Sequence, residues 1–224
     1  MKSKNENLSK NFLIYGFGKS GTSSLKFLKQ KNKCFIFDDD KKKINSKFKR
    51  FFISKSKLSN NNFDYIVISP GININRCQLS NYLKKNQKKV ITDLDIFYKF
   101  YPEVLTITIT GTNGKSTTSK LLYDILKSQN YDVRLTGNIG NPILEEKKVT
   151  RNTIFVVEAS SYQLAYSKYF KSKFSIIINI SPDHLERHNT MKNYVLSKLK
   201  CVIRQNENDI AIISKTNLLK DLLR

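Results

Sequence analysis

Short apolar runs alternate with stretches of helical periodicity in the first hundred residues. Strands are expected in NFLIYGFG (11–18), KCFIFDDD (33–40), FDYIVISPGI (63–72) and KKVITD (88–93). Helices are expected in SGTSSLKFLKQK (20–31), where Leu25 and Leu28 are spaced for one face, and around LSNYLKKNQ (79–87). Strands that alternate with helices in this way are typical of a parallel α/β sheet.

A second series follows FYKFYPEV (97–104), which contains a proline and shows no clear period. Its strands are expected in VLTITIT (104–110), IFVVEAS (154–160), FSIIINIS (174–181) and DIAIIS (209–214). Its helices are expected in KSTTSKLLYDILKSQN (115–130), MKNYVLSKLKCVIRQ (191–205) and TNLLKDLLR (216–224). We therefore expect two α/β domains, 1–97 and 98–224, and the second series looks unfinished at its end.

The chain has 224 residues and a net charge of +22, which would suit a nucleic-acid-binding protein. However, the lysines are scattered through polar connectors, and no interleaving of aromatic and basic residues predicts a stacking surface for bases. We therefore expect no nucleic-acid partner. Three well-separated cysteines give no disulfide or metal framework. No apolar run is long enough for a membrane helix. These features favour a cytoplasmic protein with no membrane partner.

The first glycine-rich stretch is GFGKSG, with Gly16, Gly18 and Gly21 in the G-x-G-x-x-G spacing. It joins a predicted strand to a predicted helix, and Asp38 ends the next strand, where a ribose-binding acid would lie. The stretch therefore predicts nucleotide or diphosphate binding at a helix N-terminus. The alternative is a glycine turn that merely packs a helix on a sheet. A dehydrogenase is a weaker reading, since it rests on this stretch alone.

The second glycine-rich stretch, GTNGKSTT (111–118), fits a short phosphate-loop pattern, G-x-x-G-K-[ST]. Backbone N–H groups of such a loop hold phosphates, Lys115 would neutralise their charge, and Ser116 would offer its hydroxyl to Mg²⁺. The alternative is a glycine-rich hairpin with an incidental lysine. The strand before it and the helix after it favour the phosphate loop.

Two more candidates follow apolar strands of the second series. Glu158 ends one strand, where a buried carboxylate is costly unless it is paired or binds a metal. Asp183 and His184 follow the next, at the sheet edge where ligands of open α/β sheets bind. The alternatives are a surface glutamate and a structural histidine. We expect His188 to lie on the surface, and Lys198 alone would be an ordinary helical lysine.

Taken together, these motifs resemble the Mur ligase family, and within it the members that add D-glutamate. The resemblance rests on GTNGKST, on EASSYQL (158–164), on GNIGNP (137–142) and, less specifically, on GFGKSG and SPGI (69–72). It implies a Rossmann-like N-terminal domain that binds a uridine nucleotide, followed by a P-loop-type central domain. It also implies a reaction in which ATP phosphorylates the carboxylate of UDP-N-acetylmuramoyl-L-alanine, and D-glutamate attacks the acyl phosphate.

The resemblance also implies roles for individual residues. The catalytic group would comprise Lys115, His184 and Lys198, and Mg²⁺ would be held by Ser116, Glu158, His184 and Lys198. Lys198 would act as a carbamylated lysine, with Lys200 as a lesser candidate. ATP would be bound by Gly111, Thr112, Asn113, Gly114, Lys115, Ser116 and Thr117. The uridine substrate would be bound by Gly18, Lys19, Ser20, Asp38, Gly71 and Asn138. Asp39 and Asp40 depart from the family pattern.

Members of that family have more central domain and then a C-terminal domain, so we expect this chain to be a fragment without the latter. The expected partners are UDP-N-acetylmuramoyl-L-alanine, D-glutamate and ATP, with Mg²⁺ as cofactor, and we expect a monomer. Two alternatives stay open. One is a nucleotide-binding module without catalysis. The other is a different Mur ligase or a folylpolyglutamate synthase-like enzyme.

Overall fold

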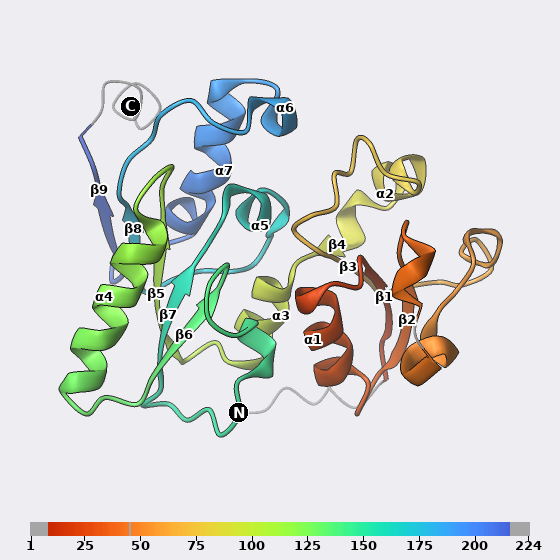
Figure 1. Ribbon diagram of the computed structural model, residues 1–224, viewed down its shortest axis with the longest axis horizontal. Coiled ribbons are helices and arrows are strands. Elements are labelled where there is room, and N and C mark those ends of the chain that lie inside the picture. The colour runs from red at the N-terminus through yellow and green to blue at the C-terminus, as the bar shows by residue number, and fades with distance from the viewer. Residues whose placement is uncertain (1–8, 45, 216–224) are drawn as a thin grey trace. The chain divides into compact units, whose positions relative to one another are not determined.

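The computed structural model describes residues 9–44 and 46–215. Contacts between residues divide the chain into two compact units, 1–93 and 94–224. Each unit contains one parallel sheet with helices beside it (Figure 1), which confirms the predicted α/β class. In the described part of the chain, no helix is long and apolar enough to cross a membrane.

The sheet of unit 1–93 has the strand order β2-β1-β3-β4, and all of its neighbours pair in parallel. Its strands are β1 (Asn11–Tyr15), β2 (Lys33–Phe37), β3 (Tyr65–Ile68) and β4 (Val90–Ile91). Its helices are α1 (Lys19–Leu28) and α2 (Ser80–Lys85), with 3-10 turns at Lys41–Lys43, Ser46–Phe51, Lys55–Lys57 and Gln87–Lys89. The strands and helices that the apolar pattern predicts are therefore all present.

The turn between β1 and α1 needs glycine for steric reasons. A Cβ on Gly21 would lie 2.0 Å from the carbonyl oxygen of Gly16, far inside the contact distance of two heavy atoms. The absence of a side chain there lets the first turn of α1 approach the end of β1, which is the packing role of the third glycine in this pattern. Gly18 is the N-cap residue of α1 and is exposed.

The sheet of unit 94–224 has the strand order β6-β7-β5-β8-β9 and is also parallel throughout. Its strands are β5 (Leu105–Thr110), β6 (Val133–Gly137), β7 (Ile154–Glu158), β8 (Phe174–Ile177) and β9 (Ile210–Ile213). The helices are α3 (Asp93–Phe100), α4 (Lys115–Ser128), α5 (Ser161–Tyr166), α6 (Leu185–His188) and α7 (Met191–Ile203), with a 3-10 turn at Ile143–Glu145. The central strand, β5, leads directly into GTNGKSTT.

Helices cover both faces of this second sheet (Figure 1). Ile109 and Val156 pack against the apolar residues of α4 on one face. Ile177 pairs with Thr110, the neighbour of Ile109, so it points to the opposite face, where it packs against Val195 and Leu199 of α7. The carboxyl end of β5 therefore lies between α4 and α7.

Four helices and strands of this unit were not predicted: β6, α3, and the short helices α5 and α6. β6 was missed because its sequence, VRLTG, has no continuous apolar run. α3 covers the start of 97–104, where no period was recognised. Its buried Leu94 and Phe97 are three residues apart, a helical spacing that becomes visible only when the window begins at Asp93. The helix predicted for 216–224 lies outside the described residues.

Candidate active site

The predicted phosphate loop lies between β5 and α4. Gly114 is the N-cap residue of α4, and Lys115, Ser116 and Thr117 form the first turn of the helix. No side chain caps this helix, and its first turn carries no acidic residue. The first N–H groups of a helix have no partner within it, so this end of α4 offers backbone donors and a partial positive charge to an anion.

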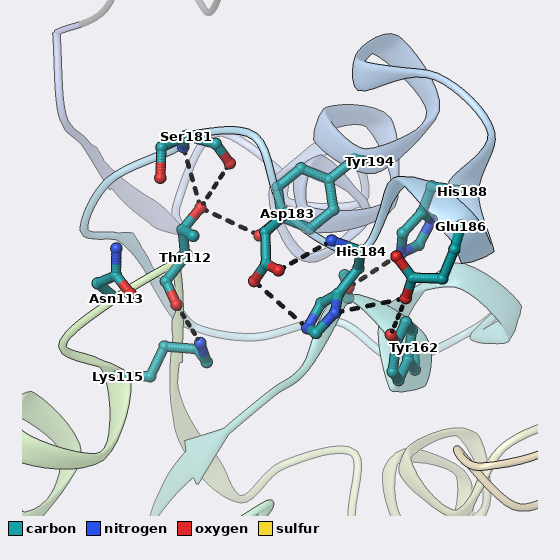
Figure 2. A network of polar contacts seen from close by, with 12 residues as sticks. Thr112, Asn113, Lys115, Tyr162, Ser181, Asp183, His184, Glu186, His188 and Tyr194 are labelled. Carbon is teal, nitrogen blue, oxygen red and sulfur yellow. Dashed lines mark hydrogen bonds and ion pairs between the residues drawn. The ribbon is translucent and has the colours of Figure 1, made fainter.

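Two backbone carbonyl groups of the loop accept hydrogen bonds from lysines, of which Lys115 is shown in Figure 2. Lys115 Nζ donates to the carbonyl oxygen of Thr112 at 2.6 Å. Lys198 Nζ, from α7, donates to the carbonyl oxygen of Gly111 at 2.7 Å. The loop thus gathers two of the predicted catalytic lysines within hydrogen-bonding distance of neighbouring peptide groups.

The side chain of Thr112 ties the loop to the segment after β8. Its Oγ1 accepts a hydrogen bond from the backbone N–H of Ser181 at 3.0 Å and lies 3.1 Å from the Ser181 carbonyl oxygen. It also shares a 3.0 Å hydrogen bond with the hydroxyl of Tyr194 (Figure 2). Thr112 is therefore buried and structural, whereas Asn113, Ser116 and Thr117 are exposed.

Glu158 is fully buried at the carboxyl end of β7, beside Ile109 of β5. Its Oε1 accepts a hydrogen bond from Asn138 Nδ2 at 2.9 Å. Gly137 permits this contact, because it has a φ of +106° and a Cβ there would lie 2.2 Å from the Glu158 carbonyl oxygen. The GNIG stretch and the strand-end glutamate therefore form one unit.

One carboxyl oxygen of Glu158 is suited to bind a divalent cation. Its Oε2 is buried and has no hydrogen-bond partner among the described residues. Orphaned carboxyl oxygens are costly, and a hard cation such as Mg²⁺ is a natural partner for them. In residues 9–44 and 46–215, no three His, Cys, Asp or Glu side chains cluster to hold a metal. A cation at Glu158 would therefore need ligands of other kinds.

Asp183 and His184 follow β8, as predicted. His184 lies in the left-handed region with a φ of +54°, which is uncommon for a residue with a side chain and is often found at functional sites. Its Nε2 lies 3.4 Å from an oxygen of Asp183, and its Nδ1 lies 3.8 Å from Glu186 (Figure 2). The imidazole is half exposed, so it remains accessible to a ligand.

Lys198 is the most unusual titratable group of the site, because its side chain is only 1% exposed. Burial, and next the positive charge of Lys115, lower the pKa of Lys198 to about 7. Its Nζ also lies 4.5 Å from the centre of the Tyr194 ring. Lys200, the lesser candidate, donates instead to the carbonyl oxygen of Ala165. Lys198 therefore contacts the phosphate loop, whereas Lys200 contacts α5.

The prediction that His188 lies on the surface is wrong. It is 7% exposed, and its Nε2 lies 3.0 Å from the Oγ of Ser161. Its ring packs against the rings of Tyr162 and Tyr194 (Figure 2). The polar sequence around His188 hid this burial, because α6 has only four residues and turns the imidazole inward between α5 and α7.

The stretch EASSYQL has a local structural role. Ser160 is the N-cap residue of α5, and its Oγ accepts from the backbone N–H of Gln163 at 3.2 Å. The Oε1 of Gln163 accepts from the backbone N–H of Ser160 at 3.1 Å. This reciprocal capping box starts α5 immediately after Glu158. The stretch therefore fixes the chain direction at the end of β7.

In unit 1–93, the predicted substrate residues surround the first glycine turn. Asp38 Oδ2 accepts from the backbone N–H of Phe17 at 2.6 Å and pairs with Lys43 at 3.2 Å. Its carboxylate therefore braces the turn. Ser20 Oγ donates to Asp93 Oδ2 at 2.7 Å. Lys19 is exposed at the start of α1, and Gly71 is exposed after β3.

Sequence reasoning missed three residues that shape the loop. Asn179 hydrogen bonds to the backbone of Thr112 and Asn113, while Ser181 and Tyr194 hold the side chain of Thr112. Asn179 could have been found, because it is a polar residue directly after an apolar strand, as Glu158 is. Tyr194 could not, since nothing in its helical pattern distinguishes it from a core residue.

The chain is similar in sequence to a known family of enzymes. Residues 109–223 match the model of the Mur ligase middle domain. The chain is 36% identical to the UDP-N-acetylmuramoylalanine--D-glutamate ligase of Caldicellulosiruptor bescii, covering 96% of the chain and 49% of that protein. It is 35% identical to the enzyme of the same name from Rickettsia bellii, covering 92% of the chain and 46% of that protein. The chain thus spans about half the length of these relatives.

Solved structures share the fold at low sequence identity. The UDP-N-acetylmuramate:L-alanyl-gamma-D-glutamyl-meso-diaminopimelate ligase from Neisseria meningitides matches with a TM-score of 0.59 at 12% identity, over 96% of this chain and 75% of that one. The UDP-N-acetylmuramate-alanine ligase from Thermotoga maritima matches with a TM-score of 0.52 at 15% identity, over 96% and 51%. By its matched middle domain, which covers more than half of its residues, this chain belongs to the Mur ligase family.

Proposed function

We propose that this chain provides the nucleotide-binding and substrate-binding parts of an ATP-dependent ligase that joins D-glutamate to UDP-N-acetylmuramoyl-L-alanine. The observation that carries the proposal is the pairing of an uncapped, phosphate-loop helix start at Gly114 with a buried, half-satisfied Glu158 at the neighbouring strand end. The relatives at about 35% identity bear the name of this ligase. We assign the two domains predicted from the sequence to the two nucleotides. Residues 1–97 would bind the uridine nucleotide, and residues 98–224 would bind ATP.

On the phosphate side, the chain supplies positive charge without covalent chemistry. The first-turn N–H groups of α4 receive phosphate oxygens, and the ammonium group of Lys115 neutralises further charge. Lys115 lies folded onto the Thr112 carbonyl oxygen, so it exchanges that partner for a phosphate when ATP binds. Gly111 to Thr117 are the residues assigned to ATP.

Mg²⁺ fits the residues at the end of the sheet. Ser116 and the orphaned oxygen of Glu158 would hold a first cation, and His184 and carbamylated Lys198 would help to hold a second. Such cations lower the repulsion between the γ-phosphoryl group and the substrate carboxylate. Asn138, which donates to the other oxygen of Glu158, orients that carboxyl group and is also assigned to the substrate.

The surroundings of Lys198 support its carbamylation. Burial favours the neutral amine over the ammonium ion. The lone pair of neutral Nζ attacks the carbon of CO₂ and forms an N–C bond. The electrons of one C–O π bond move onto oxygen, which gives a carboxylate, and the nitrogen loses a proton to water. The carbamate nitrogen keeps one N–H, which allows the hydrogen bond to the Gly111 carbonyl oxygen to persist. The lysine then offers an anionic oxygen ligand.

The proposed reaction has two steps, phosphoryl transfer and then amide formation. A carboxylate oxygen of the L-alanyl group attacks the γ-phosphorus of ATP, a P–O bond forms, and the bond to ADP breaks. The amine of D-glutamate then attacks the acyl carbon, an N–C bond forms, phosphate leaves, and the amine loses a proton. Because the chain spans about half the length of its relatives, this complete reaction is proposed for the ligase as a whole.

The test measures ADP formation with MgATP, UDP-N-acetylmuramoyl-L-alanine and D-glutamate, beside titrations of MgATP. ADP that requires both substrates supports the proposal, and Lys115→Met, which removes the ammonium group, should abolish it. MgATP binding without ADP formation, even when the rest of a related ligase is added in trans, favours the nucleotide-binding module. ADP formation with L-alanine and UDP-N-acetylmuramate, or with a folate substrate, would reassign the enzyme. A folded chain that binds no MgATP contradicts the assignment of residues 111–117.

A further inference from the structure

Asn179 contacts the phosphate loop through its whole side-chain amide. It lies two residues after β8, next to the carboxyl end of β5. Its Oδ1 accepts from the backbone N–H of Thr112 at 3.1 Å and from that of Asn113 at 2.9 Å. Its Nδ2 donates to the carbonyl oxygen of Asn113 at 3.0 Å. One amide group therefore contacts three consecutive peptide units of the loop.

These contacts add to the hydrogen bonds that hold the loop backbone. The carbonyl oxygens of Gly111 and Thr112 are held by Lys198 and Lys115, and that of Asn113 is held by Asn179. The N–H groups of Thr112 and Asn113 point at Asn179, away from the helix start. The backbone donors left for a phosphate are therefore those at the start of α4.

Asparagine is the side chain that suits this position. The loop needs an acceptor for two N–H groups and a donor for one carbonyl oxygen, and a carboxamide supplies both. An aspartate would supply the acceptor alone and would place a negative charge beside a phosphate site. Alanine would supply neither, which leaves the Asn113 N–H without its partner.

We propose that Asn179 is a positioning residue that holds the phosphate loop in its ligand-receiving shape before a nucleotide arrives. The inference rests on the proposed nucleotide-binding function, and it names the group that organises that site. A loop ordered in advance does not have to be ordered by the ligand, so less of the binding free energy is lost. Asn179 then acts on affinity through the backbone, without itself touching the phosphates.

The first test needs no ligand. Amide exchange followed by NMR reports on individual loop N–H groups. The Asn113 N–H donates to Asn179 Oδ1, whereas the nitrogen of the Thr112 N–H also lies 3.1 Å from the Asn179 backbone oxygen. Asn179→Ala should therefore speed the exchange of Asn113 at least ~10-fold and that of Thr112 less. The Ala159 amide, bonded to the Ile109 carbonyl oxygen, is the reference and should not change.

Asn179→Asp separates the acceptor from the donor. It keeps an oxygen for both N–H groups, so slow exchange at Asn113 should return to within about threefold of the wild type. This rescue would not occur if any change at this position simply loosened the fold. Equal exchange at Asn113 in the wild type and in Asn179→Ala would overturn the inference, as would a general acceleration that includes Ala159.

The second test measures the consequence for binding. Titration with MgATP should give a Kd at least ~10-fold higher for Asn179→Ala than for the wild type. The matched control is Asn206→Ala, whose Oδ1 accepts from the Asn208 N–H in the loop before β9, at the opposite end of the strands. Its Kd should stay within about twofold of the wild type.

The two tests distinguish failure of the proposed nucleotide-binding function from failure of the inference about Asn179. A wild-type chain that binds no MgATP contradicts the proposed function, while the exchange of the Asn113 N–H still decides whether Asn179 orders the loop. A wild-type chain that binds MgATP, with an unchanged Kd in Asn179→Ala, overturns the inference alone.

Discussion

Lys198 Nζ lies 2.7 Å from the carbonyl oxygen of Gly111, although 87 residues separate them in the sequence. The contact joins α7 to the first residue of the phosphate loop. It buries an amine beside a second cation, Lys115, and an acid, Asp183, both of which influence its protonation. A buried amine at this point is costly for stability, so its presence favours a chemical role.

If that role is carbamylation, the modification belongs to Lys198 and not to Lys200. Protein equilibrated with ¹³C-bicarbonate should show a carbamate carbon signal by NMR, because buried, neutral Nζ reacts with CO₂. The signal should vanish in Lys198→Met and remain in Lys200→Met, the matched control two residues away. A signal that survives in Lys198→Met would show that another group is carbamylated. The absence of a signal in the wild type would show that the protein is not carbamylated under these conditions.

Glu158→Gln should stabilise the protein without ligand and should remove its stabilisation by MgATP. The buried Oε2 has no hydrogen-bond partner among the described residues, so a neutral amide should raise the free energy of unfolding by about 1 kcal/mol without Mg²⁺. Thermal unfolding with and without MgATP measures both effects, since the variant should lose the stabilisation that MgATP gives the wild type.

Glu186→Gln is the control for that experiment, because its side chain is exposed. It should leave both the melting temperature and the MgATP effect unchanged. Full stabilisation of Glu158→Gln by MgATP would show that this carboxyl group does not serve a metal.

The capping box of α5 predicts a stability effect without a nucleotide effect. Ser160→Ala and Gln163→Ala should each lower the free energy of unfolding by about 1 kcal/mol, because each leaves a helix-start N–H group without its acceptor. The double variant should lose less than the sum, since the two bonds depend on one another. Urea unfolding measures this coupling. Additive losses would mean that the two side chains act independently.

His188 predicts a pH dependence of stability. Burial, and then the positive charge of Arg187, lower the pKa of His188 below its usual value of 6.5. The unfolded chain therefore binds a proton before the folded protein does, so the free energy of unfolding falls as the pH drops from 6.5 towards the folded-state pKa. His188→Gln should flatten this part of the curve of unfolding free energy against pH.

The matched control is His184→Gln, at the exposed imidazole four residues earlier. The stability of this variant should still fall as the pH drops from 6.5, because it retains buried His188. Parallel curves for the wild type and His188→Gln would show that protonation of His188 does not oppose folding.

The sequence predicted the strands that carry the site, because β5, β7 and β8 are apolar and each ends in polar residues. It also predicted the phosphate loop, which is a local pattern. It could not separate Lys198 from Lys200. Residues two apart on a helix point in directions about 160° apart, and which direction faces the loop depends on how α7 packs on β8.

Other features depend on contacts between distant segments. His188 and Asp95 look like surface residues in the sequence. In the folded chain, Asp95 accepts from the backbone N–H groups of Tyr169 and Phe170 at 2.7 and 2.9 Å. No periodicity near Asp95 contains information about a loop more than 70 residues away. Tyr194 was missed for the same reason.

The substrate assignment is the central claim, and a calorimetric titration tests it most directly. The folded chain is titrated with UDP-N-acetylmuramoyl-L-alanine, with NADH as the control ligand. We predict saturable binding of the muramoyl nucleotide and no binding of NADH. Binding of NADH alone, or of neither ligand by a chain shown to be folded, would contradict the assignment of residues 1–97 to a uridine nucleotide substrate.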